Sequence, residues 1–249
     1  MSLIKLKQDW EQLGHIDPYY AILSGPKLKY GKWDINEFFK TGHCEIERVL
    51  QHAVELGYPS GRELALDFGC GVGRCTRALS EYFKQCHGVD IAQNMIVRAK
   101  ELNRFISNCE FTVNREEHLR IFPDNYFDMI YTNLVLQHLP NKPMIKSYIC
   151  EFIRVLKETG LLVFQLPSYI PLRRRFQMRP RLYSLLRMLH FNERFAYQRL
   201  KLHPIRMNFI PEKEVITLLN EAGAKVLEIQ SRLIAGQAIQ DSMYYVTKD

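Results

Sequence analysis

The chain has 249 residues, of which 47% are hydrophobic and 24% charged, so it can bury a substantial core and is neither disordered nor of low complexity. Its six cysteines form no C-x-x-C pair and have no histidine-rich partners, which argues against a disulfide framework and a zinc site. The net charge of +7 comes from residues 171–209, where nine arginines and Lys201 stand against Glu193 and give +9.

The N-terminal part of the chain is rich in aromatic residues. We interpret residues 8–42 as an irregular cap and predict a helix over 44–57, where apolar residues recur at helical spacing up to Gly57. Residues 1–60 are therefore expected to form an N-terminal helical cap. No apolar run approaches the roughly 20 residues that span a bilayer, and no apolar secretory leader is seen, which favours a cytoplasmic protein.

The middle of the chain alternates between short apolar runs and helical patterns. Apolar strands separated by helices indicate a parallel sheet covered on both faces, the doubly wound α/β class. The expected strands are 63–68, 85–89, 109–113, 127–131 and 161–166, and the expected helices are 72–83, 92–102 and 142–156.

The C-terminal part returns to the same pattern after the basic segment. A helix is expected over 211–222, and strands over 225–230 and 243–247 are expected to form a hairpin. This gives one core domain from 61–170 and 210–249, with 171–209 as a basic, helical, lid-like insert after strand five.

A glycine-rich loop follows the first expected strand. Residues 65–74 read A-L-D-F-G-C-G-V-G-R, and glycines between a buried strand and a helix let a ligand lie against bare peptide groups. A dinucleotide fingerprint would place a small residue where Arg74 stands, which weakens a nicotinamide interpretation. Asp67, two residues before the first glycine, favours a ligand with an amino or cationic group over a pyrophosphate.

Further polar residues end the neighbouring strands. Asp90 ends the second strand, where a carboxylate can accept both hydroxyls of a ribose, and Thr132, Asn133 and His138 follow the fourth strand. Because the carboxyl ends of parallel strands share one edge of the sheet, these residues are expected to converge on one crevice that binds a nucleoside.

Four runs of the sequence carry a family resemblance: LDFGCGVGR at 66–74, GVD at 88–90, PDNYFDMIYTNLVLQHL at 123–139 and RVLKETGLLVFQLP at 154–167. Together they resemble the class I S-adenosylmethionine-dependent methyltransferases. The resemblance covers roughly residues 45–170 and the terminal helix and strand pair, with further likeness to a bacterial subgroup of unassigned acceptor in 33–42. It implies a Rossmann-like seven-stranded sheet whose last strand is antiparallel, and S-adenosyl-L-methionine as cofactor.

The resemblance also implies roles for individual residues. Asp67 is expected near the amino group of the cofactor, Asp90 on the ribose, and Arg115 stands where the family normally has an acid for the adenine. The remaining implied cofactor contacts are Gly69, Cys70 and Gly71 in the loop, Ile91 and Met95 against the adenine, Asn114, Glu116 or a backbone group in place of Arg115, and the backbone of Thr132 and Asn133.

On the acceptor side, His138 is the candidate general base, because it follows strand four and an imidazole can titrate near neutrality. The alternative is that His138 caps or packs against a helix end. Among the N-terminal aromatics, Tyr20, Tyr30 and Trp33 are the candidates for contact with the acceptor, against a purely structural role in the cap.

The basic insert has several interpretations. Its leucines (Leu182, Leu185, Leu186 and Leu189) can pack onto the sheet domain as a lid, or Arg173, Arg174 and Arg175 can capture an anionic acceptor. Peripheral membrane contact with a lipid-like acceptor and nucleic-acid binding are further alternatives.

The favoured function is methyl transfer to a small or medium-sized acceptor, either anionic or lipid-like. The alternatives are a nucleic-acid methyltransferase, although no paired prolines follow strand four, a cofactor-binding regulatory protein without catalysis, and an NAD-dependent dehydrogenase.

Overall fold

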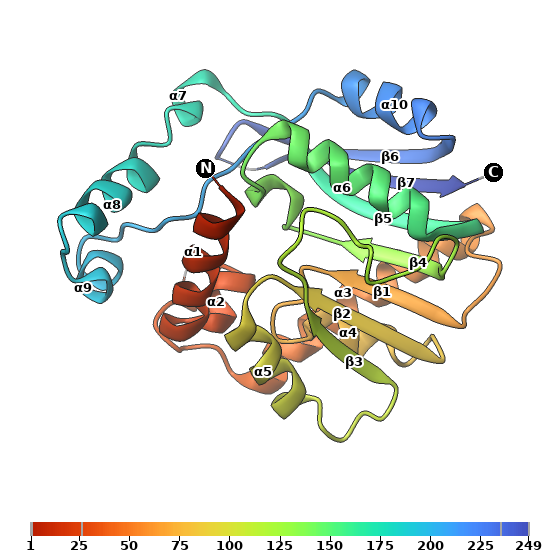
Figure 1. Ribbon diagram of the computed structural model, residues 1–249, viewed down its shortest axis with the longest axis horizontal. Coiled ribbons are helices and arrows are strands. Elements are labelled where there is room, and N and C mark those ends of the chain that lie inside the picture. Colours follow the sequence, from red (N-terminus) through yellow and green to blue (C-terminus); the bar gives the residue numbers. More distant parts are fainter. Residues whose placement is uncertain (1, 26, 235, 249) are drawn as a thin grey trace.

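The structure, a computed structural model, describes residues 2–25, 27–234 and 236–248. It contains a seven-stranded sheet in the order β3-β2-β1-β4-β5-β7-β6 (Figure 1), in which β1 to β5 run parallel and β7 lies antiparallel between β5 and β6. The predicted doubly wound sheet with an antiparallel last strand is confirmed. The strands are β1 (Leu64–Phe68), β2 (Gln85–Asp90), β3 (Cys109–Val113), β4 (Phe127–Thr132), β5 (Leu156–Tyr169), β6 (Ala224–Ile234) and β7 (Ile239–Lys248).

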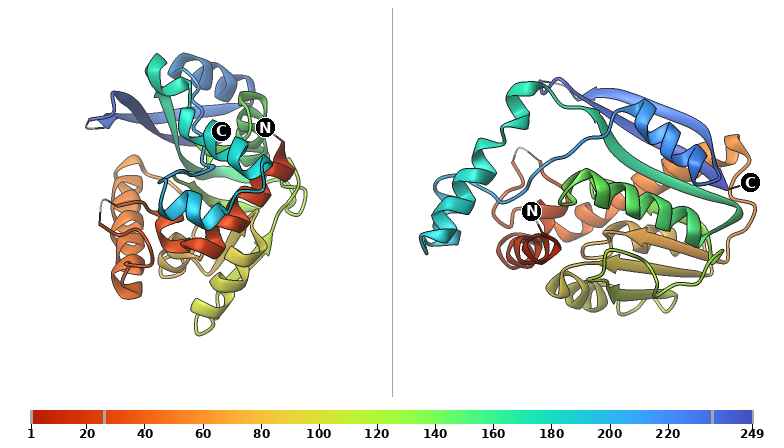
Figure 2. Two further views of the ribbon diagram at one scale, coloured as in Figure 1. Left: turned by 90° about the vertical axis from the view of Figure 1, so that its left-hand side faces the viewer. Right: turned by 45° about the horizontal axis from the view of Figure 1, so that its top comes forward.

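Helices cover both faces of this sheet, as the second view in Figure 2 shows. Alternate residues of β1 explain why: Ala65 packs with α3 and α4, whereas Leu66 packs with α6 and α10 on the other face. The helices that flank the sheet are α3 (Ile35–Leu56), α4 (Arg74–Leu79), α5 (Gln93–Leu102), α6 (Lys142–Val155) and α10 (Glu212–Glu221). None of the described helices is long and apolar enough to cross a bilayer.

The N-terminal segment is more regular than the sequence suggested. Instead of an irregular cap it forms α1 (Leu3–Ile16) and α2 (Pro18–Ile22), and α3 begins at Ile35 rather than at 44. Two caps explain the helix starts, because the Ser2 and Asp34 side chains accept hydrogen bonds from Lys5 N (3.3 Å) and Glu37 N (3.0 Å). Helix α3 ends at Gly57 in the left-handed conformation, as predicted.

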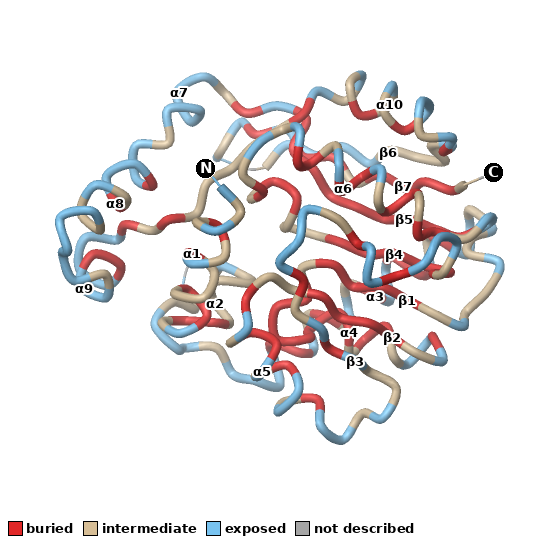
Figure 3. The backbone as a smooth tube through the Cα atoms, in the orientation of Figure 1, coloured by how far each residue is buried: buried red, intermediate tan, exposed pale blue. Residues whose placement is uncertain are grey.

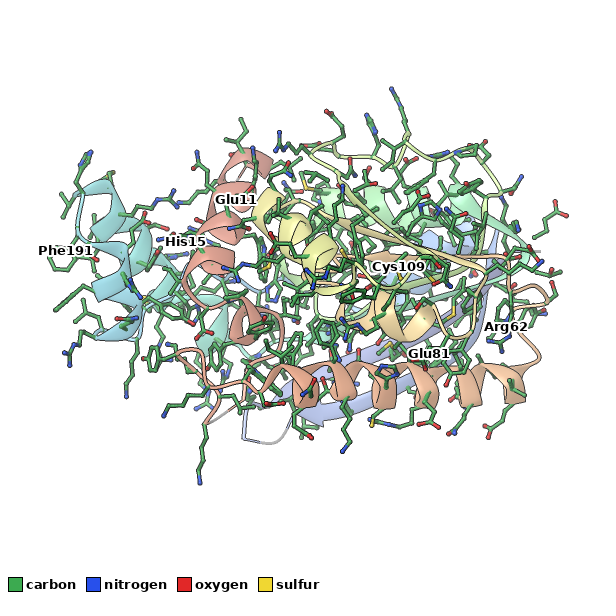
Figure 4. The ribbon with its side chains drawn as sticks, turned by 90° about the horizontal axis from the view of Figure 1, so that it is seen from below. Glu11, His15, Arg62, Glu81, Cys109 and Phe191 are labelled. Carbon is green, nitrogen blue, oxygen red and sulfur yellow. The ribbon has the colours of Figure 1, made fainter. Side chains whose placement is uncertain are left out.

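Helix α1 is attached to the N-terminus of α5. The Glu11 carboxylate accepts hydrogen bonds from Gln93 N (2.7 Å) and Asn94 N (3.1 Å), two of the amides that begin α5. Figure 4 shows Glu11 at this junction. The attachment holds α1 across the end of the sheet at which the parallel strands terminate.

The basic segment projects from the body of the molecule as α7 (Leu172–Arg175), α8 (Met178–Met188) and α9 (Glu193–Gln198) (Figure 1). The expectation that its leucines pack onto the sheet domain is wrong, because Leu182, Leu185 and Leu189 are exposed. The insert is held by the N-terminal segment: Arg187 pairs with Asp9 of α1 at 2.8 Å, and Tyr30 Oη donates to Gln198 O of α9 at 3.0 Å. Figure 3 shows exposed residues along most of α7–α9.

Candidate functional site

A pocket opens at the carboxyl ends of the parallel strands. It contains about 760 Å³ of space, the open mouth included, and is bordered by the residues that follow β1, β2, β3 and β4. From the predicted set the structure brings together Gly69, Gly71, Asp90, Ile91, Met95, Asn114, Asn133 and His138.

The glycine loop forms the floor of this pocket. Gly69 and Gly71 have φ of 77° and 55°, in the left-handed region that favours glycine. A Cβ on Gly69 would lie 2.3 Å from Val135, and one on Gly71 would lie 2.5 Å from Ile22. The loop therefore has no room for side chains and presents bare peptide groups to the pocket. Cys70 lies behind it, buried, where burial raises the pKa of its thiol.

Asp90 joins the loop to the second strand. One carboxylate oxygen accepts a hydrogen bond from Gly71 N and the other from Ala92 N, both at 2.9 Å. Burial raises the pKa of Asp90 above its ordinary value although these two amides oppose the change. Each carboxylate oxygen has a second lone pair, so Asp90 can accept two further hydrogen bonds from a ligand in the pocket.

Asp67 lies outside the pocket, which corrects the expectation that it faces a ligand amino group. Residues of a strand alternate between the two faces, and Asp67 shares the face of Ala65, toward α4. There it accepts a hydrogen bond from Thr76 Oγ1 at 2.6 Å, and burial raises its pKa to about 6. Its visible role is to link β1 to α4 beneath the loop.

The segment after β3 contributes one of its three candidates to the pocket. Asn114 is buried and lines it, but its amide is held within its own turn, donating to His118 O at 2.9 Å. Arg115 and Glu116 are exposed and do not reach the pocket, because the turn directs both toward solvent. The Arg115 guanidinium instead lies 3.3 Å from Gln93 Oε1.

Asn133 connects the pocket to a largely buried acid, Glu45, which was not identified from the sequence. The Glu45 carboxylate accepts hydrogen bonds from Asn133 Nδ2 at 2.9 Å and Tyr131 Oη at 2.7 Å, and forms an ion pair with Arg74 at 3.0 Å. Burial disfavours ionisation of Glu45, but Arg74 and these donors outweigh it and lower the pKa. Thr132 is fully buried in β4 and its side chain does not line the pocket.

The contacts of Glu45 were not predicted from the sequence, and the reason is physical. Glu45 lies on α3, 29 residues before Arg74 and 86 and 88 residues before Tyr131 and Asn133, and no local pattern relates them. Arg74, which stands where a dinucleotide fingerprint would have a small residue, was the available clue, because an arginine buried after the loop needs an acidic partner.

His138 lies at the pocket wall, in the short helix η1 (Leu136–His138). Its Nδ1 donates a hydrogen bond to the Arg206 carbonyl oxygen at 2.6 Å, so Nε2 is left as the acceptor of the neutral ring. Burial lowers the pKa of His138 to about 4. The expectation that this imidazole titrates near neutrality is therefore wrong, and His138 is uncharged at pH 7.

The remaining wall is apolar and comes largely from α1. Leu3, Leu6 and Trp10 line the pocket, and the Trp10 ring lies 5.7 Å from that of His138 between centroids. Helical spacing of Leu3, Leu6, Trp10 and Leu13 would have predicted this helix, but the aromatic richness of the whole segment obscured it. Ile22, Leu134, Val135, Leu139 and Tyr148 complete the apolar lining.

The three aromatics expected on the acceptor side lie elsewhere. Tyr20 and Tyr30 surround Lys29, whose ammonium lies 5.7 Å and 5.0 Å from their ring centroids, and Tyr30 Oη donates to Gln198 O at 3.0 Å. Trp33 packs edge-on against Phe38 and donates to Leu23 O. They connect the N-terminal helices with one another and with α9, so they do not line the pocket.

Arg173, Arg174 and Arg175 also lie away from the pocket, on exposed α7. The reason is the length of β5, which continues to Tyr169, three residues beyond the predicted end, and carries the chain past the pocket. Arg175 lies over the rings of Tyr169 and Phe209 instead of facing a ligand. Capture of an acceptor anion in the pocket by this triplet is not supported. The described residues contain no group of His, Cys, Asp and Glu suited to a metal ion.

Comparison with known proteins finds similarity to methyltransferases in the core of the sheet domain. Residues 66–164 match the family model described as a methyltransferase domain. Demethylmenaquinone methyltransferase of Tropheryma whipplei is 32% identical over 108 residues, 43% of each chain, and phosphoethanolamine N-methyltransferase of Plasmodium falciparum is 30% identical over 135 residues, 51% of this chain and 46% of the relative. The chain thus spans less than half the length of these curated relatives.

Solved structures share the fold over nearly the whole chain. Magnesium protoporphyrin IX methyltransferase from Synechocystis, solved with bound S-adenosylhomocysteine, is 15% identical, covers 99% of both chains and has a TM-score of 0.63. An S-adenosylmethionine-dependent methyltransferase from Clostridium acetobutylicum is 16% identical over 96% of this chain and 98% of its own, with a TM-score of 0.59. The resemblance to class I methyltransferases is confirmed.

Proposed function

We propose that this chain, whose residues 66–164 match the methyltransferase domain model, is an S-adenosylmethionine-dependent methyltransferase that acts on a small, largely apolar acceptor. The observation that carries the proposal is that a bare glycine loop, Asp90 and an apolar wall line the same pocket. In this proposal residues 61–170 with 210–249 bind the cofactor and residues 1–60 line the acceptor side. The insert, 171–209, contacts the pocket wall through the Arg206 carbonyl oxygen on His138.

The residues at the strand ends fit the cofactor. Gly69 and Gly71 line the pocket, where the methionine part would lie against their bare peptide groups. Asp90 has free lone pairs for the ribose hydroxyls, and Ile91 and Met95 offer an apolar surface to the adenine. S-adenosylmethionine supplies an already activated methyl group, so the protein chiefly needs to orient the acceptor and exclude water. Asn133, held by Glu45, is a further polar group in the lining of this pocket.

The acceptor part of the pocket favours an apolar molecule. Leu3, Leu6, Trp10 and Leu139 line it, and among the lining residues that the structure describes, Asp90 is the single one with a formal charge. An anionic acceptor would lose its hydration there without gaining a cation, since Arg173–Arg175 lie elsewhere. The named relatives act on demethylmenaquinone and phosphoethanolamine, so family membership by itself leaves both chemistries open.

His138 is proposed to accept the proton of a hydroxyl acceptor at Nε2. The hydrogen bond from Nδ1 to Arg206 O fixes the tautomer in which Nε2 carries the lone pair, and the low pKa keeps the ring neutral. This lone pair accepts a 3.3 Å hydrogen bond from Gln137 Nε2, which the acceptor hydroxyl would have to replace. A base with a pKa near 4 suits an acceptor whose hydroxyl is itself acidic, such as a phenol, better than an aliphatic alcohol. The rate is then expected to be independent of protonation of His138 between pH 5.5 and 8.

The proposal is tested with the purified full chain in two steps. Calorimetry with S-adenosylhomocysteine and with NADH tests the cofactor, and binding of NADH alone would overturn it. Tritiated S-adenosylmethionine is then incubated with quinol and phenol acceptors, with water-soluble phosphate and carboxylate metabolites, and with RNA. We expect tritium in the organic-soluble acceptors; transfer confined to the anionic metabolites or RNA would overturn the acceptor class while leaving cofactor binding intact.

A further inference from the structure

The basic insert carries an exposed surface of mixed apolar and cationic side chains, which we call the insert face (residues 172–200). Half of the large apolar side chains exposed in the described part of the chain fall within this segment, which is under an eighth of the sequence. They include Leu172, Phe176, Met178 and Leu189, of which the last two are 70% and 66% exposed. Such a concentration is unusual for a surface that contacts water alone.

Helix α8 organises this face. Pro180, Tyr183 and Arg187 form its inner side, with Tyr183 buried and Arg187 bonded to Asp9 of α1. At about 100° per residue, the apolar stripe lies on the opposite side of the helix, and Arg181 and Arg179 flank that stripe on its two edges. The stripe consists of Met178, Leu182, Leu185 and Leu189.

Apart from Arg187, the arginines of this face have no acidic partners among the described residues. Arg187 and Glu193 pair with each other at 3.0 Å, which uses the one acid of the insert. Within the described residues, no carboxylate lies within ion-pair distance of the exposed arginines (Arg173, Arg174, Arg179, Arg181, Arg194 and Arg199). The face therefore presents several uncompensated positive charges around an apolar stripe.

We propose that the insert face docks onto the surface of a bilayer containing anionic lipids, with the stripe of α8 in the interfacial region and the flanking arginines at the headgroups. An apolar helical stripe edged by cations is the pattern of helices that lie in a membrane interface. A second copy of the chain would bring the same positive charges together, which disfavours self-association through this face. A phosphodiester chain would pair with the arginines but leave the leucine and methionine stripe in water.

The fold holds this face at a defined position relative to the pocket. The return segment of the insert, with Pro204, Ile205 and Arg206, borders a small cavity that also contacts Trp10 and His138 of the pocket wall. Figure 4 shows Phe191 at the outer end of the insert, away from the sheet. Docking rests on this surface alone and does not require the proposed methyl transfer.

The test is sedimentation of the full chain with vesicles of phosphatidylcholine, with or without phosphatidylglycerol. We expect binding to the vesicles that contain phosphatidylglycerol. R179Q/R181Q should weaken it about 30-fold, which corresponds to about 1 kcal/mol for each arginine near the surface. L182Q/L185Q should weaken it at least about tenfold, because the apolar contact is lost without a change of charge.

A control variant, V54Q/F105Q, replaces two exposed apolar residues outside the insert, on α3 and after α5, and should bind like the wild type. Circular dichroism and S-adenosylhomocysteine affinity verify that each variant is folded. The proposal is overturned if the wild type does not bind anionic vesicles, or if L182Q/L185Q binds them as well as the control. It is also overturned if light scattering shows a dimer that L182Q/L185Q dissociates, or if a single-stranded RNA competes fully while the leucines have no effect.

Discussion

The Asp90 carboxylate offers the sharpest test of the cofactor site, through the substitution Asp90→Asn. The wild-type oxygens accept one hydrogen bond each from Gly71 N and Ala92 N at 2.9 Å. The asparagine amide keeps one acceptor but turns an NH2 toward the other amide, so one charge-assisted bond is lost and a buried donor is left without a partner. We expect the free energy of unfolding to fall by about 2 kcal/mol.

The same substitution should weaken S-adenosylhomocysteine binding. Losing the charged acceptor for the ribose hydroxyls costs about 1.5 to 3 kcal/mol, or roughly a 10- to 150-fold higher Kd, measured by calorimetry. Glu101→Gln, on the exposed end of α5, removes the same charge from the same region and should change neither quantity. If unfolding is easier but the affinity is unchanged, Asp90 holds the loop without touching the nucleoside, and the proposed site is refuted.

Three further predictions concern the pocket and its surroundings. Trp10→Ala, which removes the indole from the pocket wall, should raise KM for an apolar acceptor at least about tenfold, whereas Trp33→Ala, outside the pocket, should leave KM unchanged. Burial raises the pKa of Asp67 from its ordinary value of 3.8 to about 6, so the protonated carboxyl stabilises the fold fully below pH 3.8. About 3 kcal/mol of the free energy of unfolding is then lost as the pH rises through 6, and urea unfolding of Asp67→Asn should not show this loss. The pKa of His138, lowered from 6.5 to about 4, gives the opposite pH dependence: about 3 kcal/mol of the free energy of unfolding is present above pH 6.5 and is lost as the pH falls through 4. Urea unfolding of His138→Gln should not show this decline.

Each of these predictions has a result that contradicts it. Equal effects of Trp10→Ala and Trp33→Ala on KM would show that acceptors do not contact α1. If the free energies of unfolding of the wild type and Asp67→Asn differ by the same amount at every pH, the Asp67 carboxyl is hydrated in solution and its pKa is not raised. If the free energy of unfolding of His138→Gln still falls as the pH is lowered through 4, the loss comes from another group.

The sheet could be read from the sequence because its strands are short apolar runs separated by helical patterns. Strand β3 was predicted with its observed bounds, and β1, β2 and β4 differed from their predicted bounds by one residue at one end. These elements are determined by local pattern, since a parallel strand buried on both faces has to be apolar throughout. Convergence of Gly69, Asp90 and Asn133 also followed, because parallel strands end at a common edge.

Tertiary packing decided what surrounds that edge. Which face Asp67 takes, how far β5 carries the arginine triplet, and whether α1 or the later aromatics cover the pocket depend on contacts between distant segments. The Glu45–Asn133 hydrogen bond and the Arg206 carbonyl on His138 span 88 and 68 residues of sequence. The sequence by itself therefore determined the sheet and the cofactor edge through local periodicity, whereas burial and long-range hydrogen bonds, which have no local pattern, decided the acceptor wall, the neutral histidine and the exposed insert face.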